Sequence, residues 1–233
     1  MSRAPLATLA ALSAVLLAGC SGLPPETLVP LQGGEAAAGL SLGVDLDGTP
    51  NPDVGVWAGV GLGRGVDAAV GLDVPMMLMA GGPAAVGLPG KGALPGLSLR
   101  KTFDNGIGVG VGSGSRLLFL PADSSAAIPR VSTAGVFVTT ATAVDQTLQG
   151  RATLHVGYAE VRRPNAAATR RGLAVHVASQ LGPAIAMADT ARAVMAVQGR
   201  AGAFVWPHRG LVQGPTVGVI GQVVDVSGPP ELD

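Results

Sequence analysis

Few residues in this 233-residue chain have the type and spacing that catalysis requires. Residues 39–43 (GLSLG) match the G-x-S-x-G pattern of serine hydrolases, in which a sharp turn into a helix presents the serine. Here an alternation of apolar and small residues continues through Val44 and Leu46, so Ser41 is predicted to lie within a strand. We therefore expect no catalytic residue and no enzymatic activity.

Two of the three histidines, His155 and His176, fall on the smaller-residue faces of consecutive predicted strands. Such a pair could form a metal or proton site inside a barrel. No carboxylate or further ligand stands at a diagnostic spacing, and the glycine-rich runs at 59–65 and 106–114 lack the G-x-G-x-x-G offsets of nucleotide loops. We expect ordinary hydrogen-bonding histidines, no metal and no bound cofactor.

Four arginines, Arg162, Arg163, Arg170 and Arg171, bracket a predicted loop. One interpretation is a solvated loop. The other is contact with phosphates of lipopolysaccharide or of another anionic head group, because guanidinium groups bind phosphates bidentately. Nucleic acid is not an expected partner, since no stacking aromatic residues accompany the arginines.

The net charge is zero, but its two signs are separated along the chain. Residues 21–73 hold seven acids and one arginine, whereas residues 151–209 hold eight arginines and two acids. If the chain closes into a barrel in sequence order, acids of the first strands should face a wall that carries His155, His176 and Arg192. That arrangement would place a transverse field across the lumen.

The first 18 residues have one early cation, Arg3, and an apolar stretch from Leu6 to Ala18. This stretch is too short for a membrane span and is typical of a secretory signal. It leads into Leu17, Ala18, Gly19 and Cys20, the last of which is the single cysteine of the chain.

This tetrapeptide resembles the lipobox of bacterial lipoproteins. The resemblance implies that Leu17, Ala18 and Gly19 are recognised by the signal peptidase and that the chain is cut before Cys20. It also implies a diacylglyceryl group on the Cys20 thiol and a palmitate-like acyl chain on its amine. Ser21 follows, where inner-membrane retention signals usually place Asp, and this favours the outer membrane. The alternative is a plain signal peptide followed by an incidental cysteine.

Four segments are expected on this basis. Residues 1–19 are the lipoprotein signal peptide, and residues 20–38 are the lipidated cysteine with a flexible tether rich in proline and glycine. Residues 39–226 form the folded domain, and residues 227–233 form a C-terminal tail.

The chain is 48% hydrophobic and 13% charged, with a mean hydropathy of +0.45. Because no apolar run of membrane-helix length follows residue 20, the hydropathy must come from a period of two. Apolar residues alternate with small ones through 40–46, 54–62 and 66–74, and an Asn105-Gly106 pair marks a later hairpin. Further strands are predicted at 97–103, 107–111, 131–141, 152–161, 173–181, 201–206 and 216–226, with weaker ones at 76–79 and 84–88.

One segment has two interpretations. Asp189 and Thr190 could cap a short helix near 189–198, with Gly199 following it. The alternative is a strand that places Ala193, Met195 and Val197 on one face.

These patterns predict an all-β fold, an antiparallel up-and-down meander closing into a barrel of roughly 8–12 strands of bilayer-crossing length. Opposite the apolar residues, the first three strands carry mostly glycine, with aspartate but no lysine or glutamate. Over residues 39–226 the chain resembles small outer-membrane β-barrel proteins. The resemblance implies an apolar face toward lipid and a lumen lined by the opposite face. The polar residues expected to face the lumen are Asp45, Asp67, Asp73, His155, His176 and Arg192.

Together, the lipobox and the alternation predict a non-enzymatic lipoprotein of the bacterial outer membrane, with a structural role or a role in small-solute passage. Its expected partners are membrane lipid, lipopolysaccharide or another envelope protein. The alternative is a soluble β-domain that is tethered by lipid, faces the periplasm and binds an apolar ligand or a partner protein.

Overall fold

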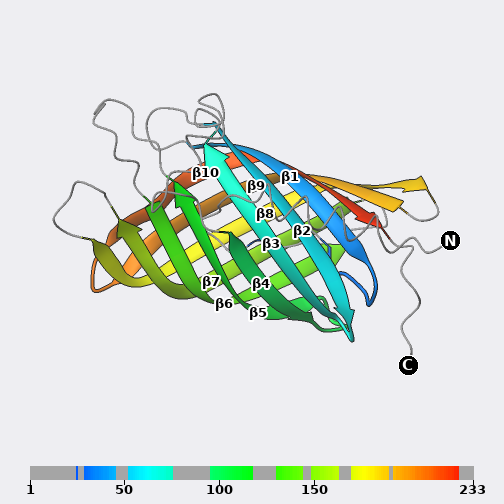
Figure 1. Cartoon of the computed structure of the whole chain (residues 1–233), viewed down its shortest axis with the longest axis horizontal. Coiled ribbons are helices and arrows are strands. Elements are labelled where there is room, and N and C mark those ends of the chain that lie inside the picture. The colour runs from blue at the N-terminus through cyan, green and yellow to red at the C-terminus, as the bar shows by residue number, and fades with distance from the viewer. Residues whose placement is uncertain are drawn as a thin grey trace.

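Ten antiparallel strands close into a barrel in the order of the chain (Figure 1). This computed structural model describes Pro25 and residues 29–45, 52–75, 95–117, 130–143, 148–162, 169–188 and 191–225. The predicted all-β meander and its closure are confirmed. The strands are β1 (Ala36–Asp45), β2 (Pro52–Gly63), β3 (Val66–Pro75), β4 (Gly96–Thr102), β5 (Ile107–Leu117), β6 (Arg130–Ala143), β7 (Leu148–Arg162), β8 (Arg170–Ala188), β9 (Ala191–Trp206) and β10 (Gly210–Asp225).

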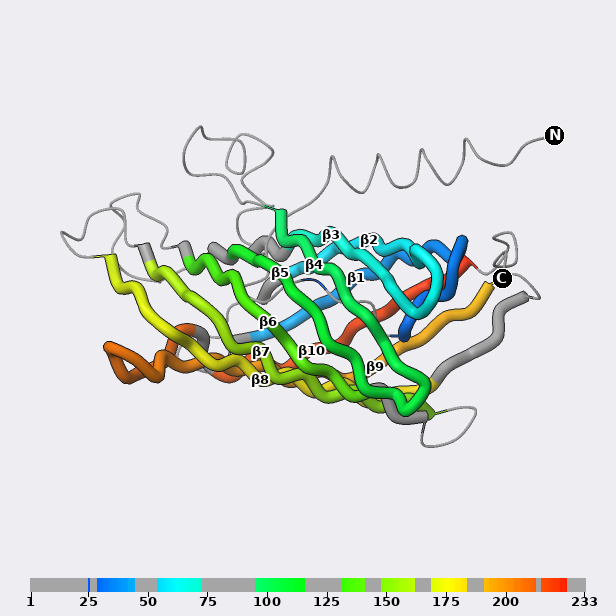
Figure 2. The backbone as a smooth tube through the Cα atoms, turned by 90° about the horizontal axis from the view of Figure 1, so that it is seen from below, coloured from blue at the N-terminus to red at the C-terminus, as the bar shows by residue number. Residues whose placement is uncertain are grey.

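Pairing of the first and last strands closes the sheet. Ala36 pairs with Asp225 on β10, and the same residue of β1 pairs with Val60 on β2. Every other strand pairs with its two neighbours in sequence. Figure 2 shows β1–β3 along the upper side of the barrel and β8 and β9 along the lower side. Closure satisfies the backbone groups that the edges of an open sheet would leave unpaired.

The period of two in the sequence becomes an inner and an outer face. Leu40 and Leu42 on β1 are exposed on the outside, whereas Ser41 between them is buried on the inside. The same alternation places Leu97 and Leu99 outside β4. Large exposed apolar side chains of this kind occur on β1, β2 and β4–β10.

The two ends of the barrel differ in the length of their connections. At one end, here called the turn end, β2–β3 and β8–β9 are joined by two residues each, and β4–β5 and β6–β7 by four each. Arg64 and Gly65 both have positive φ in the first of these, as a type I′ hairpin requires. At the other end, the loop end, the longest connections are residues 76–95 and 118–129.

The helix considered near 189–198 is wrong, because residues from Ala191 onward belong to β9. Ala193, Met195 and Val197 instead alternate with buried Val194 and Ala196, so the barrel wall supplies the packing that decides the structure. Asp189 and Thr190 lie outside the described residues, as do the weaker strands proposed at 76–79 and 84–88. No helix in the described part of the chain is long and apolar enough to cross a membrane.

Candidate functional site: the lumen of the barrel

The interior is polar between two apolar clusters. At the turn end, inward side chains of β1, β2, β9 and β10 form one cluster, which includes Trp57 and Ile220. At the loop end, Phe204 and neighbours from β6–β10 form the second. Buried polar residues occupy much of the remaining inner face: Ser98, Arg100, Thr139, Arg151, Thr153, His155, His176, Gln198 and Gln222, with Asp67 beside Arg100.

Asp67 and Arg100 form a buried ion pair on neighbouring strands. They are direct register partners on β3 and β4. Both the Nε and an Nη of Arg100 donate to the same Asp67 oxygen, at 3.1 and 2.7 Å, and the two side chains are 3% and 2% exposed. Buried charges require such partners, because an isolated ion loses most of its solvation away from water.

A segment that precedes β1 lies inside the barrel. We call Pro25 together with residues 29–35 the luminal segment. Val29 and Leu31 are 7% and 1% exposed and pack in the turn-end cluster with Trp57 and Ile220. A flexible tether is expected from the sequence at 20–38. The described part of this range is instead packed against the barrel wall, and β1 begins at Ala36.

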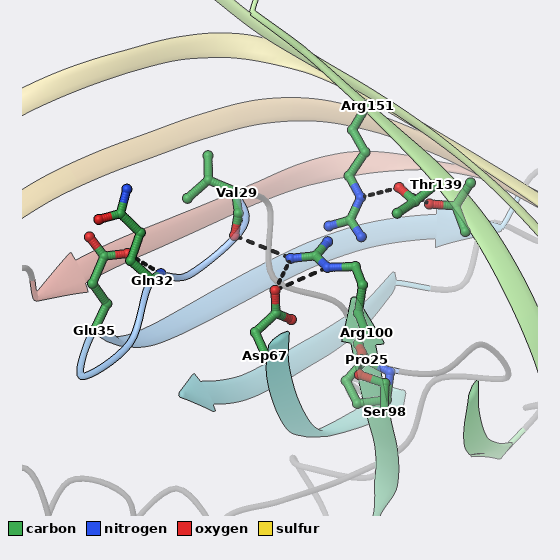
Figure 3. Close-up of polar contacts among 10 residues, drawn as sticks. Pro25, Val29, Gln32, Glu35, Asp67, Ser98, Arg100, Thr139 and Arg151 are labelled. Atoms are coloured by element: carbon green, nitrogen blue, oxygen red, sulfur yellow. Dashed lines mark hydrogen bonds and ion pairs between the residues drawn. The ribbon is translucent and has the colours of Figure 1, made fainter. Parts of the chain in front are cut away.

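Polar contacts connect the luminal segment to β4. The Ser98 hydroxyl donates to the Pro25 carbonyl, and Arg100 donates to the Val29 carbonyl at 3.4 Å. Figure 3 shows these contacts around the Asp67–Arg100 pair. The segment thus accepts hydrogen bonds through its backbone, while both charges of the ion pair come from the barrel wall.

Glycines in the wall leave the space that the segment fills. A Cβ atom placed on Gly61 would lie 1.7 Å from the carbonyl oxygen of Gln32, and one on Gly71 would lie 2.8 Å from the Cβ of Pro25. Any larger residue at these positions would collide with the segment. The space is available because a ten-stranded barrel is wider than the eight-stranded size that wall side chains alone fill.

A tight turn brings the luminal segment to the start of β1. The Glu35 amide donates to the Gln32 carbonyl at 3.0 Å, and Gly34 has a φ of 83°, as a type II turn requires at its third position. The Glu35 carboxylate accepts from the Gln32 amide at 2.8 Å and from Arg192 on β9 at 3.4 Å. Arg192 therefore contacts the luminal segment, rather than facing acids of the first strands.

Two other luminal arginines bond to neutral groups of the wall. The Nε of Arg151 donates to the Thr139 hydroxyl at 2.8 Å, and Arg200 donates to the Gln198 side chain at 2.9 Å. In Figure 3, the guanidinium of Arg151 points toward that of Arg100. Positive charge is thus spread over β4, β7 and β9, and Asp67 bonds to the adjacent strand rather than to the opposite wall.

His155 and His176 are brought together. They are register partners on β7 and β8, each is 1% exposed, and their ring centroids lie 5.6 Å apart at 64°. Gly202 makes room for the second ring, since a Cβ there would lie 2.1 Å from the Cδ2 of His176. No group of three or more metal-ligating residues surrounds the pair in the described part of the chain, so the geometry gives no complete metal site.

The loop end carries the arginines singled out in the sequence. Arg171, at the start of β8, pairs with Glu160 on β7 at 3.1 Å, and its side chain is 61% exposed. Arg162 is the last residue of β7 and pairs in register with Arg130 on β6. Arg170 begins β8, and Arg163 lies outside the described residues. Nearby on the outer face, Tyr158 and Trp206 are 49% and 70% exposed.

The remaining predicted residues are placed as follows. Ser41 lies within β1, paired with Gly55 and Ile220, and no turn into a helix follows it. Asp45 and Asp73 are strand residues of β1 and β3 whose side chains lie outside the described part. The lipobox residues Leu17, Ala18, Gly19 and Cys20 lie outside it as well.

Sequence reasoning missed Arg100 and the luminal segment. Arg100 stands between Leu99 and Lys101 in an alternating run, and this position was the signal that its side chain faces the lumen, where it pairs with Asp67. The prolines of residues 20–38 suggested an extended tether. The apolar residues Val29 and Leu31 within this range were the signal that part of it is buried.

Comparison with known proteins gives structural neighbours only. No family model matches the chain, and no curated protein matches it. The N-terminal β-barrel domain of OprF from Pseudomonas aeruginosa is 8% identical, with 82% of this chain and 97% of that chain covered and a TM-score of 0.34. Neisserial surface protein A is 8% identical, with 82% and 94% covered and a TM-score of 0.38. Ail, the attachment invasion locus protein of Yersinia pestis, is 8% identical, with 83% and 98% covered and a TM-score of 0.26.

Proposed function

We propose that this protein is a non-enzymatic lipoprotein of the bacterial outer membrane whose barrel spans the bilayer, with a structural role or a role in small-solute passage. The lipid anchor on Cys20 is part of this proposal and is supported by the lipobox resemblance. The short connections of the turn end would face the periplasm and the longer ones the outside, as in outer-membrane barrels.

The observation that carries the proposal is the inversion of the two faces. Valine and leucine side chains in the middle of the strands, such as Val111, Val136 and Val197, are 54%, 58% and 59% exposed on the outside. Arginine, histidine and glutamine are buried inside. A water-soluble barrel would bury the first set and expose the second, whereas in lipid the exposed apolar set is in its preferred solvent.

The arginines at the loop end fit the same orientation. Arg171 and its strand neighbours would lie where phosphates of lipopolysaccharide are found, next to Tyr158 and Trp206. Amphipathic aromatic residues at this level are typical of a membrane interface. Anionic lipid is therefore the partner that we propose for this part of the barrel.

A test combines a Cys20→Ser variant with gel mobility and extraction. Without its acylation site, the chain should still need detergent for extraction from membranes, and it should run as a folded species that shifts on boiling. A variant that is released as a folded monomer into plain buffer would reject the spanning barrel and support the tethered soluble domain. Metabolic labelling with a palmitate analogue, present for the parent and absent for Cys20→Ser, tests the anchor separately.

A further inference from the structure

We infer that the luminal segment is a releasable plug, and that the barrel conducts small solutes when the segment leaves the lumen. The inference rests on the proposed membrane-spanning function. The segment joins the barrel through a turn at Gln32–Glu35 that contains Gly33 and Gly34. Residues before that turn belong to none of the ten strands.

Release of the residues that precede the Gln32–Glu35 turn would leave the buried ion pair of the wall intact, and Glu35, which pairs with Arg192 at 3.4 Å, belongs to the turn itself. Asp67 and Arg100 belong to β3 and β4 and bond to each other directly, so their ion pair survives when Val29 departs. Among the described residues of the plug, Pro25 and Val29 accept hydrogen bonds from Ser98 and Arg100 through their carbonyls. Water entering the lumen can replace both acceptors, because a water-mediated hydrogen bond is nearly as favourable as a direct one.

Two apolar side chains of the plug are buried in the barrel. Val29 and Leu31 pack in the turn-end cluster, with Trp57 on β2 and Ile220 on β10 among its members. Ordering a chain segment opposes this burial, since each fixed residue loses backbone entropy. A polar group at Leu31 would therefore favour the released state while leaving the strands and their register unchanged.

The lumen without the plug has a lining suited to water and small polar solutes. Thr139, Thr153 and Gln198 are buried polar residues on β6, β7 and β9, close to the side chains of Arg151 and Arg200. Inward glycines such as Gly61 and Gly71 leave space along β2 and β3. This lining is polar where the core of a soluble barrel would be filled with apolar side chains.

The experiment measures potassium chloride current through the purified full chain in a planar lipid bilayer. Leu31→Asp should raise the fraction of time spent open by at least roughly tenfold, because a fully buried leucine is replaced by a charge. Leu211→Asp on the outer face at the loop end is the matched control and should leave the open fraction at the parent value. Folding of each variant is checked by its mobility shift on boiling.

A reversible disulfide between the plug and the barrel wall supplies the second part of the experiment. In a Cys20→Ser background, Pro25→Cys with Ser98→Cys introduces one thiol in the plug and one on β4, at two residues that a hydrogen bond from the Ser98 side chain to the Pro25 backbone carbonyl holds in contact. The oxidised protein should stay closed even with Leu31→Asp added, and reduction should restore the current; Ser98→Cys alone should respond to neither treatment. If folded Leu31→Asp conducts no more than the parent, and reduction of the disulfide changes nothing, the segment is a fixed part of the core. Failure of every variant to enter membranes would instead overturn the proposed function.

Discussion

Replacing one residue of the buried Asp67–Arg100 pair should destabilise the barrel more than replacing both. Removing one partner leaves an uncompensated buried charge, whereas removing both removes the need for compensation. We therefore expect Arg100→Met to lower the free energy of unfolding by about 3–5 kcal/mol. Addition of Asp67→Asn should restore most of that loss.

Urea unfolding of the barrel in phospholipid vesicles, followed by tryptophan fluorescence, measures both values. Trp57 lies inside the turn-end cluster and reports on that part of the lumen. Equal destabilisation by the single and double replacements would show that the ion pair is not energetically coupled.

Gly39 and Gly221 provide a second comparison of single residues. A Cβ on Gly39 would lie 2.2 Å from the Trp57 ring, whereas one on Gly221 meets no atom within 4 Å. Gly39→Ala should destabilise the barrel by about 1–3 kcal/mol, because Trp57 must shift in a packed interior. Gly221→Ala should leave the unfolding midpoint near the parent value in the same urea titration. Indistinguishable midpoints for the two variants would contradict the close packing of Trp57 against β1.

At the scale of elements, a charge on the outer face of a strand should destabilise the barrel more when it lies deeper in the bilayer. Val136 in the middle of β6 and Leu211 at the loop end of β10 have similar exposures, 58% and 62%. Val136→Arg should lose about 2–4 kcal/mol of folding free energy in vesicles, and Leu211→Arg about 0–1 kcal/mol. Similar small effects at both positions would indicate that the outer face meets water.

A strand could be predicted from the sequence where apolar and small residues alternate along its whole length. Residues 54–62 and 66–74 alternate over their whole length, and β2 and β3 are found there. Residues 191–198 were ambiguous, because alanine suits a helix. The contacts with β8 and β10 that favour a strand exist only after these strands have paired. In the candidate site, alternation placed Asp67, His155 and His176 on one face. The apolar pair Val29 and Leu31 marks the luminal segment, but the wall residues that it contacts are defined only by the closed barrel.

For the whole molecule, the difference between its two ends predicts an orientation in the membrane. The turn end has connections of two to four residues, and the loop end has connections as long as residues 76–95. A protease site inserted between residues 163 and 168 should be cut on intact cells, since long loops of outer-membrane barrels face outward. The same site inserted in the β4–β5 turn at Asp104 and Asn105 should be cut only after permeabilisation. The reverse pattern of cleavage would contradict the orientation.

The pairing of Ala36 with Asp225 sets a condition on biogenesis. The nascent polypeptide cannot close its cylinder until β10 has been synthesised and exported, because the seam joins β1 to β10. Contacts between such remote positions form slowly. During that interval the strands destined for hydrocarbon would be exposed to water and prone to aggregate, so delivery to the membrane should depend on a chaperone that holds all ten strands unfolded.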